Sequence, residues 1–77
     1  MKINLDKIRL KRLELGFSQE YVSESLGISQ AHYSRLERGN KEFTIDILGK
    51  LICLLEINPM DVFIFSNHIK NLMKVKK

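Results

Sequence analysis

Hydrophobic residues recur three or four positions apart along most of this chain, which is the spacing of helices that bury one face. Four such stripes run through the first 55 residues, and they predict a helix over residues 5–15 and three more helices after it. The stripes are Leu5, Ile8, Leu13, Leu15 and Phe17; Val22 and Leu26; Tyr33 and Leu36; and Leu48, Leu51, Ile52 and Leu55. No segment alternates hydrophobic and polar residues as a half-buried strand does, so the pattern predicts an all-α domain without strands.

Polar caps and glycines mark the ends of these helices. A serine or threonine precedes the second, third and fourth helices, where its side-chain oxygen can accept a backbone N–H of the first turn. A glycine follows each of the first three, where it permits the left-handed backbone that ends a helix. These positions are Ser18, Ser29 and Thr44, and Gly16, Gly27 and Gly39. Asn58, with Pro59 at the first helical position, begins a fifth helix.

The segment from Ser18 to Gly39 places two short helices on either side of a turn at Gly27, which is a helix-turn-helix layout. At 100° per residue, the second of these helices, the third of the chain, has two different faces. One face carries Tyr33, Leu36 and Glu37, and the opposite face carries Ala31, Ser34, Arg35 and Arg38. We therefore expect the first face to pack and the second to be presented to a partner.

Several spaced motifs resemble the Cro/cI-type (XRE-like) helix-turn-helix DNA-binding domains of phage repressors and many bacterial regulators. The motifs are Ile8-Arg-Leu-Lys-Arg12, Leu15-Gly-Phe-Ser-Gln-Glu20, Leu26-Gly-Ile-Ser29 and Leu36-Glu-Arg-Gly39, followed by the helix Thr44–Leu55 and by Asn58–Phe63. The resemblance covers roughly residues 5–65. It implies a five-helix, phage-repressor-like fold with the helix-turn-helix at helices 2 and 3, and a role as a regulator that binds double-stranded DNA.

The exposed face of the third helix carries the candidate base-reading residues. Gln30 can bind an adenine edge and Arg35 a guanine edge through paired hydrogen bonds, while His32 can reach a base or a phosphate. The small side chains of Ala31 and Ser34 let the helix approach the bases closely. By resemblance, all of these except His32 fall where the family reads bases, and His32 falls where some members do. The alternative is that these residues only solvate an exposed helix.

Candidate phosphate contacts surround that face. Gln19 begins the second helix, where its side chain and the backbone N–H groups can meet a phosphate that the helix dipole attracts. The resemblance implies the same role for it. Asn40 and Lys41, in the loop after the third helix, are further candidates, together with Arg38 and Arg9. The alternative is that these side chains are ordinary solvated surface.

The resemblance also pairs Arg12 of the first helix with Glu37 of the third. A guanidinium can bind a carboxylate through two parallel hydrogen bonds, so we favour a structural pair over a DNA contact of Arg12. Two positions depart from the family pattern. Ser23 stands where alanine is usual, so its hydroxyl needs a local carbonyl. Tyr33 replaces a common isoleucine, so either the core is bulkier or the phenol reaches the DNA backbone.

Composition and charge narrow the class of protein. The 77 residues form one small domain, with too few hydrophobic residues for both a core and a large substrate pocket, so we expect a binding module and not an enzyme. The net charge of +4 belongs to the tail, because residues 1–69 carry nine Lys/Arg and nine Asp/Glu. One cysteine, Cys53, and two histidines suggest neither a disulfide nor a zinc site, and we expect no cofactor. Apolar runs far shorter than a membrane span indicate a cytoplasmic protein.

The fifth helix carries two apolar stripes if it continues beyond Met60. One consists of Val62, Phe65, Ile69 and Leu72, and the other of Met60, Phe63 and Ile64. We expect one stripe to pack internally and the second to form a two-fold dimer contact, although a single broad core face is the alternative. The domain is expected to cover residues 1–66, and the basic tail, residues 67–77, to form either a further helix or a solvated end.

The resulting hypothesis is a sequence-specific regulator that binds a palindromic operator as a homodimer. An autoregulatory repressor or the controller of a restriction-modification system fits this description. The alternative is an antitoxin or another protein-interaction module that binds a partner protein, such as a toxin, through its C-terminal helix.

Overall fold

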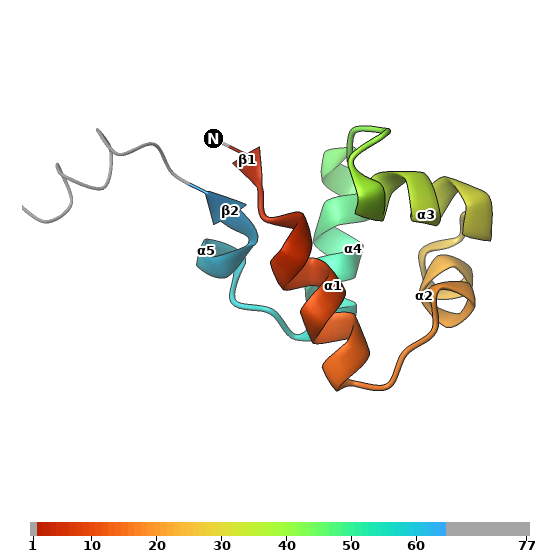
Figure 1. Cartoon of the computed structure of the whole chain (residues 1–77), viewed down its shortest axis with the longest axis horizontal. Helices are drawn as coiled ribbons and strands as arrows, with labels where there is room; N and C mark the ends of the chain where they lie inside the picture. Colours follow the sequence, from red (N-terminus) through yellow and green to blue (C-terminus); the bar gives the residue numbers. More distant parts are fainter. Residues whose placement is uncertain (1, 65–77) are drawn as a thin grey trace, which may run out of the picture.

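The computed structural model describes residues 2–64, and within that range it contains five helices and one pair of short strands (Figure 1). In chain order the elements are β1 (Lys2–Ile3), α1 (Leu5–Glu14), α2 (Gln19–Leu26), α3 (Gln30–Arg38), α4 (Ile45–Leu55), α5 (Pro59–Val62) and β2 (Phe63–Ile64). The all-α class and the five helices are confirmed, with the helix-turn-helix at α2 and α3.

Each of these helices begins at a polar N-cap whose side-chain oxygen accepts a backbone N–H. The four predicted caps are confirmed, and Asn4 is a fifth that the hydrophobic spacing did not indicate. The bonds are Asn4 to Lys7 (3.2 Å), Ser18 to Tyr21 (3.0 Å), Ser29 to His32 (3.0 Å), Thr44 to Ile47 (3.2 Å) and Asn58 to Met60 (3.0 Å). Local sequence therefore determines where the helices start.

The helices do not all end at a glycine. Gly27 ends α2 with φ +76°, a left-handed conformation that glycine adopts without steric cost and that turns the chain directly into α3. α4 instead ends at Glu56, a non-glycine residue with φ +54°. The fourth glycine, Gly49, lies inside α4 and ends nothing. A glycine is thus a good but incomplete guide to where these helices stop.

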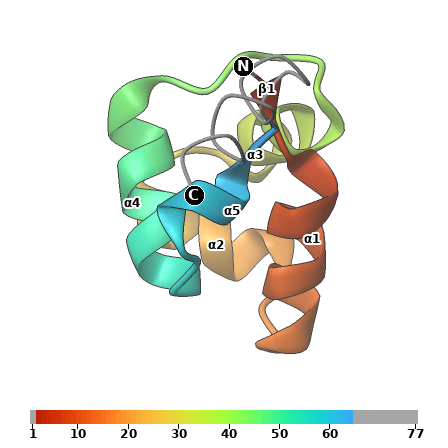
Figure 2. The same cartoon turned by 90° about the vertical axis from the view of Figure 1, so that its left-hand side faces the viewer.

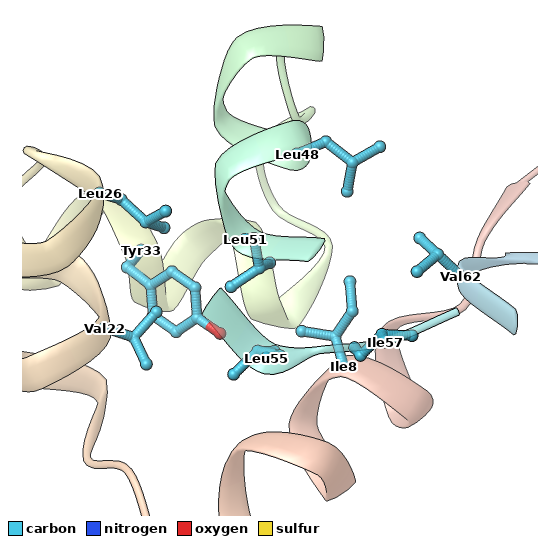
Figure 3. Packing of buried hydrophobic residues seen from close by; sticks show 9 residues of the cluster. All are labelled: Ile8, Val22, Leu26, Tyr33, Leu48, Leu51, Leu55, Ile57 and Val62. Carbon is cyan, nitrogen blue, oxygen red and sulfur yellow. The ribbon is translucent and has the colours of Figure 1, made fainter. Parts of the chain in front are cut away.

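The core lies where the inward faces of the helices meet. In Figure 2, α1 and α4 stand on opposite sides of the molecule, with α2 and α3 behind them. α2 packs against α3 and α4, and α1 packs against α3, α4 and α5. Figure 3 shows the buried cluster, which consists of Ile8, Val22, Leu26, Tyr33, Leu48, Leu51, Leu55, Ile57 and Val62. Burial of this apolar surface is the main favourable contribution to folding.

The expectation that the chain forms no strand is wrong. β1 and β2 pair antiparallel, with Lys2 opposite Ile64 and Ile3 opposite Phe63, and the N–H of Asn4 donates to the carbonyl of Val62 over 2.6 Å. Two residues are too few to show an alternating pattern, and the partner strand is about sixty positions away. Only the folded chain brings them together, so local sequence carried no signal of the pair.

The long fifth helix is also corrected. α5 ends at Val62 and the chain continues as β2, so Met60, Phe63 and Ile64 do not form one helical stripe. Val62 is fully buried, whereas Met60 and Ile64 are 54% and 45% exposed. The remaining predicted positions of the fifth helix, and the tail over 67–77, lie outside the described residues.

The hydrophobic stripe predicted for the first helix is broader than the face that α1 buries. Leu13 and Leu15 are exposed, and the buried residues of α1 are Ile8 and Arg12, one helical turn apart. The buried face of α1 therefore includes a charged residue, which a pattern of hydrophobic positions cannot reveal. Arg12 can be buried because it has a charged partner, Glu37.

Candidate nucleic-acid interface

The third helix presents the two faces that its sequence predicted. Tyr33 and Leu36 are fully buried and Glu37 nearly so. On the other side Ala31, Arg35 and Arg38 are exposed and Ser34 is half-buried. Gln30, at the first helical position, is exposed, and His32 beside it is half-buried. Four of the five predicted base-reading residues, all but His32, therefore follow one side of α3 from its N-terminus, with Arg38 one turn further on.

The helix-turn-helix crossing depends on a small buried residue in α2. Ser23 is 2% exposed, and its hydroxyl donates to the backbone carbonyl of Glu20 over 2.8 Å. The predicted local carbonyl is therefore confirmed as the partner of this hydroxyl. The backbone N–H of Ile28 donates to the carbonyl of Ser23 over 3.0 Å, which closes the turn after Gly27. A compact crossing holds α3 in a fixed orientation on α2.

Arg12 and Glu37 lie together between α1 and α3. The guanidinium Nε donates to Oε2 of Glu37 over 2.8 Å, and Nη2 donates to Oε1 over 2.9 Å, which is the two-bonded arrangement of a guanidinium with a carboxylate. Nη1 donates to the carbonyl of Phe17 over 2.8 Å, in the connection between α1 and α2. One buried side chain thus joins α1, that connection and α3.

Tyr33 completes the surroundings of this carboxylate. Its ring lies in the core beside Val22 and Leu51, with the hydroxyl directed away from Leu26 (Figure 3). The hydroxyl donates to Oε2 of Glu37 over 2.6 Å. Of the two alternatives for Tyr33, the structure has the bulkier core: the phenol is fully buried and binds Glu37.

Gln19 is the fourth member of the cluster. Its side-chain Nε2 donates to Oε1 of Glu37 over 3.1 Å, from the first position of α2. Sequence reasoning expected Gln19 at the DNA backbone and missed this contact, because the two residues are 18 positions apart and no local pattern joins them. We refer below to Arg12, Gln19, Tyr33 and Glu37 as the Glu37 cluster.

The electrostatics of the cluster favour an ionised Glu37. Burial by itself raises the pKa of this carboxyl, but the hydrogen bonds from Arg12, Tyr33 and Gln19 outweigh burial, and the pKa is lowered. The hydrogen bond with Glu37 raises the pKa of Arg12. Burial, followed by the hydrogen bond with Glu37, raises the pKa of Tyr33 strongly. At neutral pH the cluster therefore holds one guanidinium, one carboxylate and a neutral phenol.

Apart from Gln19, the predicted phosphate contacts occupy two regions. Arg38, Asn40 and Lys41 are exposed at the end of α3 and in the loop that follows, where the N–H of Asn40 donates to the carbonyl of Arg35 over 2.9 Å. Arg9 is exposed on α1 and forms a 3.3 Å ion pair with Asp6. The structure thus brings three of the cationic or polar candidates to the C-terminal end of α3, and places Arg9 on another helix.

The predicted dimer residues lie at the opposite end of the molecule from α2 and α3 (Figure 1). Met60 projects from α5 and Ile64 from β2, and both are large exposed hydrophobic residues. Phe63 is half-buried and packs against the core. Two of the three residues therefore leave apolar surface open to solvent, while the third also belongs to the fold.

Comparison with known proteins identifies the family of this chain. A family model described as helix-turn-helix matches residues 8–62. No curated protein and no solved structure matches the chain. Over residues 2–64, no helix has the length and hydropathy to span a bilayer. In the same range, no three His, Cys, Asp or Glu side chains are grouped so that they could hold a metal ion.

Proposed function

The chain belongs to the Cro/cI-type (XRE) helix-turn-helix family of DNA-binding transcription regulators, and from this premise we propose that it binds a palindromic operator as a homodimer. We propose further that it acts as an autoregulatory repressor or as the controller of a restriction-modification system. The observation that carries the DNA-reading proposal is the division of α3 into a buried and an exposed face. A helix so fixed can enter the major groove with one constant set of side chains.

Base reading is assigned to Gln30, Ala31, His32, Ser34 and Arg35. The exposed guanidinium of Arg35 suits the N7 and O6 acceptors of guanine, and the amide of Gln30 suits the N7 and N6 groups of adenine. Ala31 and Ser34 are small enough for the bases to approach the helix backbone. His32, half-buried on the flank, is assigned to a base edge or a phosphate beside them.

Backbone binding is assigned to Gln19, Arg9, Arg38, Asn40 and Lys41. Contacts with phosphates position the protein on the duplex and supply affinity for any sequence. Lys41 and Arg38 are exposed beside the end of α3, so they can neutralise phosphates that flank the groove. Residues 2–64, these cations included, carry nine Lys/Arg and nine Asp/Glu, so the placement of the positive charges matters more than their number.

Two copies are proposed because one domain of this size contacts few bases. A two-fold dimer reads two half-sites about 10 bp apart, centre to centre. Met60 and Ile64, which are exposed, and Phe63 behind them supply the proposed contact. Analytical ultracentrifugation at tens of micromolar tests this directly. Sedimentation of the 9.0 kDa chain as a monomer throughout would reject the dimer and leave this apolar surface for a different protein partner.

Selection of bound sites from random double-stranded DNA tests the function as a whole. We expect an inverted repeat to be enriched. Arg35→Ala should then weaken binding to the selected site by about 1–3 kcal/mol and leave binding to unrelated DNA nearly unchanged, because a base contact discriminates between sequences. An equal loss on all sequences would reassign Arg35 to a phosphate.

Lys41→Ala provides the complementary measurement. It should weaken binding to both kinds of DNA and reduce the slope of log affinity against log salt by about one unit. Lys50→Ala is the matched control, because Lys50 is an exposed lysine on α4 that pairs with Asp46 over 3.3 Å. Identical salt slopes for the two variants would remove Lys41 from the set of phosphate contacts.

A further inference from the structure

Each oxygen of the Glu37 carboxylate accepts two hydrogen bonds. A carboxylate offers about four lone-pair positions on its two oxygens. Oε2 accepts from Arg12 Nε and from the Tyr33 hydroxyl, and Oε1 accepts from Arg12 Nη2 and from Gln19 Nε2. In the described part of the chain, no buried side-chain nitrogen or oxygen lacks a partner. Loss of any one of these donors therefore leaves a lone pair of the buried carboxylate without a hydrogen bond.

The four hydrogen bonds differ in where their donors come from. Arg12 reaches Glu37 from α1 and Gln19 reaches it from α2, whereas Tyr33 stands one turn before Glu37 on the same helix. An intrahelical bond between positions i and i+4 fixes a side chain relative to its own backbone. Tyr33 thus holds the carboxylate in place on α3, while Arg12 and Gln19 tie that fixed carboxylate to other helices.

The orientation of the Gln19 amide follows from its partner. A carboxylate only accepts hydrogen bonds, so the amide must turn its nitrogen and not its oxygen toward Oε1 of Glu37. The nitrogen carries a second hydrogen, which this contact leaves available. A phosphate is also a pure acceptor and can take that hydrogen. The contact with Glu37 therefore selects one orientation of the Gln19 amide, in which the nitrogen keeps a second hydrogen for another acceptor at the start of α2.

We propose that the Tyr33 hydroxyl is a positioning group for DNA backbone binding: by fixing Glu37 on α3, it orients the Gln19 amide so that its second hydrogen meets a phosphate. This rests on the proposed function, because it requires the phosphate contact of Gln19. The role belongs to a residue that is fully buried and contacts no DNA itself. It also gives a reason for tyrosine at this position, where its ring packs in the core and its hydroxyl acts on the surface through two hydrogen bonds.

Tyr33→Phe tests the proposal because it retains the ring and removes only the hydroxyl. Without that donor, Glu37 can rotate to share its remaining partners, and Gln19 loses its single preferred orientation. We expect affinity for the selected site and for unrelated DNA to fall by a similar factor, about two- to fivefold, the effect of one weakened hydrogen bond. Tyr21→Phe is the matched control: it removes the same group from a residue of α2 that is 47% exposed, and it should leave affinity unchanged.

A double-mutant cycle with Gln19→Leu separates positioning from a general loss of packing. If Tyr33 acts through Gln19, Tyr33→Phe has little further effect on DNA affinity once Gln19 is leucine. If the two losses simply multiply, the positioning role is wrong and Tyr33 only stabilises the fold. Wild-type protein that binds no DNA would instead reject the proposed function, so the two failures are distinguishable.

The DNA-free protein provides an independent readout. In NMR spectra, Tyr33→Phe should shift the side-chain amide resonances of Gln19, and Tyr21→Phe should not. Unchanged Gln19 resonances in Tyr33→Phe would overturn the link even if DNA binding were weaker. Should Tyr33→Phe be partly unfolded, all variants are compared in trimethylamine N-oxide, which favours the folded state.

Discussion

At the scale of single residues, Glu37 shows how a charge can be part of a small core. Taking a carboxylate out of water is unfavourable unless close partners and further hydrogen bonds compensate. Arg12, Tyr33 and Gln19 supply those bonds, and together they lower the carboxyl pKa although burial raises it. The resemblance to known regulators implied the partner Arg12, and burial of Glu37 followed from the faces of its helix. The other two partners emerged only from the fold.

Acid should weaken the fold through this residue. The folded pKa of Glu37 lies below its ordinary value, so the stability it contributes is fully present above the ordinary pKa of about 4.3 and is lost as pH falls through the folded value. Glu37→Gln should lower the free energy of unfolding by about 3 kcal/mol at pH 7, because it leaves Arg12 buried without its charge partner. In urea titrations, the difference in free energy of unfolding between wild type and Glu37→Gln should become smaller toward pH 3.

Glu24→Gln makes the same chemical change at an exposed position of α2. We expect its free energy of unfolding to stay within about 0.5 kcal/mol of wild type at pH 7. The assigned role of the carboxylate would be contradicted if wild type and Glu37→Gln differed by the same free energy of unfolding from pH 7 to pH 3.

At the scale of elements, the helix-turn-helix could be predicted because the residues that start and end its helices act within a few positions of the chain. A hydroxyl or amide oxygen at each N-cap fills backbone donors that the helix itself cannot fill, and this requirement does not depend on the rest of the fold. Gly27 is needed because α3 must start at once after α2, through a left-handed residue. The buried face of α1, which precedes the helix-turn-helix, could not be predicted in the same way. It includes Arg12, whose burial depends on Glu37 of α3.

Two glycines in equally open surroundings should respond to alanine in opposite directions. A Cβ added at Gly49 or at Gly27 would meet no heavy atom within 4 Å, but Gly27 has φ +76° and Gly49 has an ordinary helical backbone. Gly49→Ala should raise the free energy of unfolding by about 0.5–1 kcal/mol through helix propensity. Gly27→Ala should lower it by about 1 kcal/mol, the strain of an L-residue in a left-handed conformation. Urea titrations that move both variants in one direction would refute this reasoning.

At the scale of the whole molecule, the strand pair closes the described chain on itself. β1 precedes α1 and β2 follows α5, so their pairing ties the beginning of the domain to its end. The same pairing stops α5 after Val62 and turns Ile64 toward solvent. The proposed dimer surface is therefore a short helix and an edge strand at one end of the molecule, and α3, the proposed DNA-reading helix, is at the other end.

Substitutions in opposite strands should separate folding from association. Ile3 is half-buried and packs on the core, so Ile3→Ser should lower the free energy of unfolding by about 1–2 kcal/mol. Ile64→Ser, on an exposed residue, should change the stability of the monomer by less than about 0.5 kcal/mol. If Ile64 lies in the dimer contact, the dimer should dissociate at about tenfold higher concentration, as measured by ultracentrifugation. Unchanged association of Ile64→Ser would move the contact elsewhere.

The sequence by itself determined the first four helices, the start of the fifth, four of the five N-caps and the two faces of α3, because spacing of hydrophobic residues and capping chemistry act within a few positions of the chain. It also indicated the pair of Arg12 and Glu37, through resemblance and not through local physics. Tertiary structure decided the roles of Tyr33 and Gln19 beside Glu37, the strand pair that ends α5, and the exposure of Leu13 and Leu15. The bond between Tyr33 and Glu37 joins neighbouring turns of α3, but it forms because both side chains are buried by other helices. The remaining features depend on contacts between residues far apart in the chain or on which surface a neighbouring helix covers, and no local pattern records either.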